Sequence, residues 1–93
     1  ATEKKVYVGK AIKYFSNLGV GEFQIEASDM HVGDKLLITG PTTGALFMDL
    51  EEVRYDLRPV EGVQKGMRVS FKVPDKIRPS DKLYKMVQAE KGV

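Results

Sequence analysis

The chain has 93 residues, 42% of them hydrophobic and 30% charged, and its fifteen Lys and Arg against thirteen Asp and Glu give a formal net charge of +2. A chain of this length buries about 60–65% of the surface that it exposes when unfolded, which allows one modest core and excludes a second domain. The absence of cysteine excludes a disulfide framework, a thiolate metal site and a Cys nucleophile.

We expect residues 1–93 to form a single β-barrel domain with its core over about 6–87 and short flexible ends. Ala1 is a small residue of the kind left when an initiator Met is removed, so a complete small protein is expected. No run approaches the roughly 18 apolar residues of a membrane span, and we therefore expect a cytoplasmic protein without membrane contact.

Alternation with a period of two runs along most of the chain and predicts strands. The first apolar run, residues 6–15, is rich in β-branched and aromatic residues. Lys10 and Lys13 lie on opposite parities in this run, so its inward face is undetermined, and a bulge near Gly9 would resolve the conflict. Asn17 and Gly19 predict a hairpin turn into the next strand.

In the second strand, residues 21–27, apolar side chains alternate with Glu and Gln, which predicts one buried face and one wet face. A helical face of Leu46, Leu50 and Val53 is an alternative further on, but the Arg58-Pro59 pair argues against a long helix. Further strands are expected at residues 35–39 and 45–50, which a turn at 40–44 joins, and at 53–58 and 68–73.

Three segments share one sequence pattern: an apolar residue is followed by Gly or Ser, then by Asp or Met, then by a cation, and then by the apolar residue that begins a strand. In the first segment Gly33 can take a positive φ, and Asp34 and Asp81 can accept backbone N–H groups where strands begin. This repeated turn chemistry favours an all-β fold, a small six- or seven-stranded Greek-key-like barrel. The segments are residues 30–36, 63–69 and 77–83.

Five short motifs occur in order along the chain: VGKAIKYF at 8–15, GV at 19–20, VGDKL at 32–36, ITG at 38–40 and DKLYK at 81–85. Together they resemble the small translation elongation factor-like proteins, which are similar to the second, β-barrel domain of elongation factor Tu and to the carboxy-terminal barrel of the collagenase-like peptidase family. The resemblance covers about Val6 to Val87 and implies a barrel of the translation-factor type. It departs from the family at Gly66-Met67 and Ser80-Asp81, where Gly-Asp is usual, and this leaves the turn shapes there open.

The resemblance implies a non-catalytic barrel, because the GTP-binding loop and the peptidase chemistry of these families lie in other domains. A loop does gather Ser28, Asp29, His31 and Asp34, but sequence neighbours seldom form a preorganised triad, and we expect them to shape turns. One His is too few for a zinc site. We therefore predict no enzymatic activity, no catalytic residue, no metal and no cofactor.

Charge is divided unevenly along the chain. Residues 1–15 hold four Lys and one Glu, a net +3; residues 16–63 hold three cations and nine acids, a net −6; residues 64–93 hold eight cations and three acids, a net +5. First and last strands tend to be neighbours in a barrel, which predicts one basic sector opposite an acidic one, with Tyr rings to stack on bases. The candidate nucleic-acid-binding residues are Lys10, Lys13, Tyr14, Arg68, Lys72, Lys82, Tyr84 and Lys85.

The predicted function is that of a module that binds RNA, either tRNA or rRNA, or a ribonucleoprotein. The alternative is a protein-interaction accessory domain for a collagenase-like peptidase or RNA-modifying enzyme, since the acidic middle of the chain repels RNA and suits a basic protein surface. The same lysines also have a purely structural explanation, because exposed Lys side chains keep β-domains soluble and prevent their edge strands from pairing with other chains. We expect a monomer.

Overall fold

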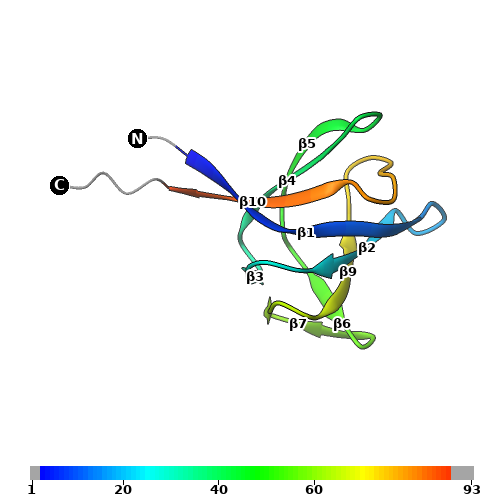
Figure 1. Cartoon of the computed structure of the whole chain (residues 1–93). Helices are drawn as coiled ribbons and strands as arrows, with labels where there is room; N and C mark the ends of the chain where they lie inside the picture. Colours follow the sequence, from blue (N-terminus) through cyan, green and yellow to red (C-terminus); the bar gives the residue numbers. More distant parts are fainter. Residues whose placement is uncertain (1–2, 89–93) are drawn as a thin grey trace.

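β-Strands and turns make up the computed structural model, which describes residues 3–88 and has no helix in that range (Figure 1). The expected flexible ends fall partly at residues 1–2 and 89–93, outside the described residues. The all-β class is confirmed. The strands are β1 (Glu3–Phe15), β2 (Val20–Ile25), β3 (Met30–His31), β4 (Lys35–Gly40), β5 (Gly44–Asp49), β6 (Val53–Tyr55), β7 (Arg58–Val60), β8 (Gly62–Val63), β9 (Arg68–Lys72) and β10 (Lys82–Gln88).

Eight of these strands form one strongly curved sheet in the order β5-β4-β10-β1-β2-β9-β6-β7, and β3 pairs with β8 in a separate ribbon. The first and last strands are antiparallel neighbours, as expected for a barrel. The structure has more strands than the six or seven expected. β3 and β8 are only two residues long and too short to show alternation, and β6 and β7 divide a segment that was expected to begin as a single strand.

The core lies on the concave side of the sheet. The alternation of the second strand is confirmed as far as Ile25, since Gly21, Phe23 and Ile25 are buried while the residues between them are half-buried. Ala27, which was expected on the same buried face, lies beyond the end of the strand and is exposed. Phe23 stacks on Phe71 of β9 with ring centroids 4.5 Å apart. Burying a large apolar side chain contributes about 1.5–3 kcal/mol. The fully buried larger side chains are Phe23, Ile25, Met30, Leu36, Ile38, Leu50, Ile77 and Leu83.

Two irregularities in β1 settle its inward face. The pairing with β10 shifts between Tyr7 and Gly9, and the pairing with β2 shifts between Ala11 and Lys13. The bulge expected near Gly9 is thus confirmed, but the second irregularity, which lies between Lys10 and Lys13, is the one that lets both of these lysines face outward. Gly9 lies so close to β2 that a Cβ there would overlap the backbone oxygen of Gln24.

The single strand expected over residues 53–58 is wrong. Asp56 and Leu57 have φ angles of 55° and 68°, so the chain reverses between β6 and β7. Two central residues with positive φ fit the twist of a tight hairpin. The sequence hid this turn because it carries neither Asn nor Gly there, and Leu57, which the alternation placed on the apolar face, is 91% exposed.

The expected strand-start turn is confirmed at its first copy. Gly33 has a φ of 101°, and the backbone N–H of His31 donates to Asp34 Oδ2 at 2.8 Å. The N–H of Asp34 in turn donates to the carbonyl of His31 at 3.0 Å. The side chain and the backbone of Asp34 therefore each close the turn with one hydrogen bond to His31.

The other two copies keep this geometry despite their departures from Gly-Asp. Ser80 takes a φ of 74°, and Asp81 Oδ2 accepts from the N–H of Arg78 at 3.0 Å. In the middle copy the sulfur of Met67 stands where the Asp oxygen would be, 3.1 Å from the N–H of Gln64. The turn shape left open by the sequence is thus the same in all three copies.

Asp81 joins three parts of the fold. Its side chain is buried, and Oδ2 also accepts from Thr43 Oγ1 in the turn between β4 and β5. Its carbonyl accepts from the N–H of Ala11 at 2.7 Å, which ties the turn to β1. Gly40 lies directly against the carboxylate, where a Cβ would overlap Oδ1.

Candidate functional site

A row of cations crosses the outer face of the sheet. Lys82 of β10 lies opposite Lys10 of β1, Lys10 lies opposite Gln24 of β2, and Gln24 lies opposite Arg68 of β9. Directly opposed residues of antiparallel strands project on the same side, so these four side chains share one face. The structure therefore brings together three of the eight predicted nucleic-acid-binding residues, and we call Lys82, Lys10 and Arg68 the basic row.

Three other predicted cations lie apart from this row. Lys13 is exposed and places its Nζ 5.1 Å from the centre of the Phe15 ring. Lys72 is exposed near the end of β9. Lys85 is the most enclosed, since its side chain is 15% exposed and its Nζ donates to Asp29 Oδ1 at 2.8 Å and to the Asp29 carbonyl at 2.9 Å. This ion pair ties β10 to the loop before β3.

The expected separation of a basic sector from an acidic one is wrong. Glu26 Oε2 lies 3.7 Å from Lys10 Nζ, and Glu22 is opposite Lys13 in the sheet. The acidic and basic segments mix because β2, which belongs to the acidic middle of the sequence, pairs with the basic strand β1. Exposed pairs of this kind contribute little to stability, but they reduce the local positive charge.

The two predicted tyrosines have different surroundings. Tyr14 packs partly against the core. Tyr84 lies half-buried on the outer face, with its ring edge-to-face against Tyr7 at 5.8 Å and with Lys5 Nζ 4.7 Å from the ring centre. Only Tyr84 therefore borders the basic row.

An outer apolar row runs beside the basic row, and the sequence did not reveal it. Phe47 of β5, Leu37 of β4, Tyr84 of β10 and Tyr7 of β1 are opposed in turn across four strands. Phe47 is 60% exposed at the open end of this row. The side chains come from distant parts of the chain, so only knowledge of the strand order would have found it.

Glu26 sets the ionisation of Tyr7. The Tyr7 hydroxyl donates to Glu26 Oε1 at 2.7 Å. This hydrogen bond, helped by burial and by the negative charge of Glu26, raises the pKa of Tyr7 to about 12. At neutral pH Tyr7 is therefore a neutral donor, and its hydroxyl is already occupied by the neighbouring carboxylate.

The loop with the single His places an imidazole near a carboxylate, but within residues 3–88 it forms no hydrogen-bonded pair of a nucleophile and a base. His31 Nε2 is 3.9 Å from Asp29 Oδ2, and both side chains are more than half exposed. The hydrogen bond from Lys85 holds the pKa of Asp29 below its usual range. Within the described part of the chain, no three His, Cys, Asp or Glu side chains come together as metal ligands.

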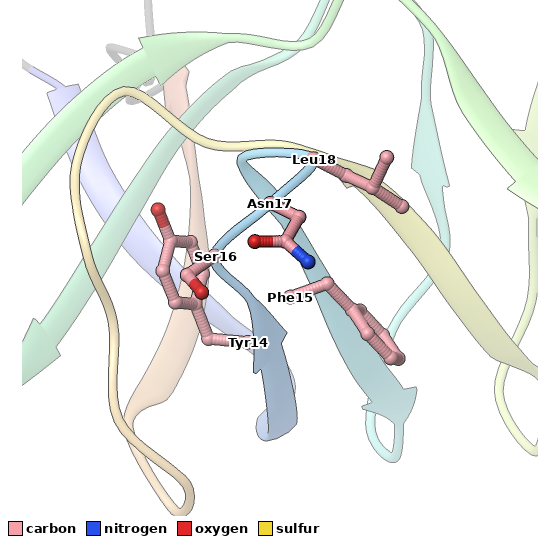
Figure 2. A pocket seen from close by; sticks show the side chains of 5 residues that line it. All are labelled: Tyr14, Phe15, Ser16, Asn17 and Leu18. Carbon is pink, nitrogen blue, oxygen red and sulfur yellow. The ribbon is translucent and has the colours of Figure 1, made fainter.

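Two open hollows mark the surface. One, of about 480 Å³, is lined by the uncharged residues 14–18 of a single hairpin turn, whose side chains point to both sides of the turn (Figure 2). The other, of about 440 Å³, lies between the β4–β5 turn and β10, with Lys82 and Tyr84 among its lining. Neither contains a pair of titratable groups arranged for acid–base catalysis. No helix in residues 3–88 could serve as a membrane span.

These features define a small all-β domain, and comparisons with known proteins agree on its fold. It superposes with a TM-score of 0.80 on the C-terminal domain of a Geobacillus thermoleovorans protein assigned to the U32 peptidases, at 18% identity, covering 85% of this chain and 90% of that one. A selenomethionine form of the same domain gives a TM-score of 0.79. No family model matches the chain.

Sequence relatives place the chain more closely. It is 56% identical over 90 residues to a collagenase of Porphyromonas gingivalis, covering 97% of this chain and 22% of the collagenase. A second collagenase of that species is 55% identical, with 96% and 25% covered. An uncharacterised protease of Methanocaldococcus jannaschii is 28% identical, with 87% and 20% covered.

The chain is therefore homologous to one segment of the collagenases, and it spans about a fifth to a quarter of the length of the relatives it matches. The expected resemblance to the collagenase-like peptidase family is confirmed as similarity to one segment of these proteins. The part that pointed to translation elongation factors finds no support in these comparisons.

Proposed function

We propose that the chain is a non-catalytic accessory domain of the collagenase-like peptidase type, which acts by binding the catalytic part of such a protein. The observation that carries this proposal is the coverage of the relatives. Nearly all of this chain matches, but more than three quarters of the first collagenase lies outside the matched segment. That remainder is long enough to hold a catalytic domain of ordinary size.

The composition of the surface supports a protein partner. Cations of the outer face alternate with acids, as Lys10 with Glu26 and Lys35 with Glu3, so the face has no uniform charge. Exposed apolar side chains lie at Leu18 in the turn after β1 and at Leu57 in the turn after β6. A mixture of apolar anchors and alternating charge is typical of protein interfaces.

The test uses the Porphyromonas gingivalis collagenase from which its own matched segment has been deleted. We expect this chain and the truncated collagenase to co-elute on size-exclusion chromatography with light scattering, in a complex that contains equal numbers of the two proteins. The intact collagenase is the control, because its own segment would occupy the site. Absence of a complex at tens of micromolar, with a truncated protein that circular dichroism shows to be folded, would refute the proposal.

The basic row favours a second candidate, RNA binding, because its three exposed cations lie on one face of four adjacent strands, where each can contact a phosphate group. The test is fluorescence anisotropy with a tRNA mixture at two salt concentrations. Substitution of Lys10, Lys82 or Arg68 by Gln should weaken binding and lower the salt slope by about one each, whereas exposed Lys76→Gln should not. No binding near micromolar at low salt would exclude this candidate.

A further inference from the structure

The two edges of the main sheet differ in how they are protected. The β7 edge has three residues, and Pro59 in its centre has no N–H to offer another strand. The β5 edge has six residues, GALFMD, with no proline and a single charge at Asp49. Proteins commonly blunt exposed edges with proline, charge or short length, and β5 has none of these protections along Ala45–Met48.

The side chains of β5 are also incompletely covered. Leu46 and Met48 face inward and pack against the core but remain half-buried. Phe47 faces outward, lies opposite Leu37 in the outer apolar row and is 60% exposed. Strand β4 covers these three residues from one side, and Figure 1 shows no strand of the sheet on the other. An additional strand there would cover apolar groups on both faces.

A second copy of β5 satisfies this requirement with a simple two-fold register. If Phe47 lies opposite Phe47 of the second copy in an antiparallel pair, the outer faces of the two sheets remain on the same side. Leu46 then lies opposite Met48 and Ala45 opposite Asp49, so apolar groups meet on both faces. Asp49 is the only charge of the strand, and in this register it does not face its symmetry mate.

We propose that β5 is a self-association edge, through which two copies of the chain form a two-fold symmetric dimer with one continuous sheet. The pair of strands spans residues 45–49, about 17 Å at 3.4 Å per residue. Phe47 and its mate lie at the centre, and the outer apolar rows of the two copies join end to end. The proposed dimer differs from the monomer expected from the sequence, which could not show which strand forms an edge.

Disulfide trapping tests the register, because the chain contains no cysteine and a single introduced one is unambiguous. Opposed residues of an antiparallel pair have Cα atoms about 4.5–5.5 Å apart, within the range of a disulfide. Phe47→Cys should therefore form a covalent dimer under mild oxidation. Ala45→Cys is the matched control, since its mate lies four residues along the pair, about 14 Å away, and it should cross-link at least tenfold more slowly.

Sedimentation equilibrium of the unmodified chain tests the association itself. We expect a reversible dimer, and Phe47→Lys should raise its dissociation constant at least tenfold by setting two cations opposite each other. Leu57→Lys also replaces an exposed apolar side chain by a cation, in the turn beside the other edge strand β7, and should have no effect. A chain that stays monomeric at several hundred micromolar, or an Ala45→Cys variant that cross-links as fast as Phe47→Cys, would overturn the proposal.

Discussion

Removal of the buried carboxylate of Asp81 should be among the most destabilising single changes to a polar side chain of this domain. Its Oδ2 accepts hydrogen bonds from the Arg78 N–H and from Thr43 Oγ1. A hydrogen bond to a charged group contributes about 1.5–3 kcal/mol, and because Arg78 and Thr43 are partly accessible to water we take the lower value for each. Asp81→Ala should then cost about 3 kcal/mol, from a total that is about 5–15 kcal/mol in most domains.

Gly40 makes this prediction sharper, because a Cβ there would overlap Asp81 Oδ1 and lie 2.6 Å from Cγ. Gly40→Ala alone should cost about 2 kcal/mol by overpacking. In the double variant the added methyl group occupies the space that the carboxylate leaves. We therefore expect a total cost of about 3 kcal/mol rather than the sum of the two single changes, which is a coupling of about 2 kcal/mol.

Urea denaturation followed by circular dichroism gives these free energies. With a slope of about 1.5 kcal/mol per molar urea, Asp81→Ala should lower the midpoint by about 2 M. Asp34→Ala is the matched control, because Asp34 has the same place in the first strand-start turn but is more exposed and accepts from the His31 N–H alone. The reasoning is refuted if Asp81→Ala costs no more than Asp34→Ala, or if the Gly40 and Asp81 substitutions are additive.

Three further predictions concern other contacts. The raised pKa of Tyr7, about 12, implies that the stability from its hydrogen bond to Glu26 is complete below pH 10 and is lost between about pH 10 and 12. Absorbance at 295 nm follows the ionisation of the Tyr side chains, and Tyr7→Phe should remove the ionisation step at the highest pH. The lowered pKa of Asp29 implies a contribution to stability that is present above the usual pKa of Asp and is lost as acid protonates the Asp29 carboxylate. In Lys85→Gln, carboxyl NMR should show that the pKa of Asp29 rises, and an unchanged pKa would contradict the ion pair. Gly9→Ala should cost about 3 kcal/mol in thermal or urea unfolding because its Cβ would meet a β2 backbone oxygen, and a neutral result would mean that the two strands separate easily.

Much of the fold could be predicted from residues next to one another in sequence. The alternation of 21–27 identified a half-buried strand, and the turns at 16–19 and 40–44 carried Gly where hairpins need it. The turn at Asp56 and Leu57 was missed because Leu rarely adopts a left-handed backbone, and Asp56 without a following Gly is a weak turn signal. The repeated strand-start turn was predicted from Asp34 and Asp81, but Met67 showed that a sulfur can take the same place, which residue preferences do not reveal.

The candidate site was harder to predict, because it depends on which strands pair. That β1 and β10 are neighbours was predicted, and this placed Lys10 beside Lys82. The ion pair of Lys85 with Asp29 could not be predicted, since the two residues are 56 positions apart. The same holds for the outer apolar row, where Phe47 meets Leu37 only in the register of a particular hairpin.

The pairing of β1 with β10 has a consequence for how the domain joins to other polypeptide. Glu3 lies opposite Gln88 at the end of the ribbon that these strands form, so the described chain enters and leaves the domain at one place (Figure 1). A linker of a few residues from Gln88 to Glu3, with new ends opened in the exposed turn at 16–18, would preserve every strand pair. The domain is thus suited to circular permutation, and it can be inserted into a loop of a host protein without separating the ends of that loop.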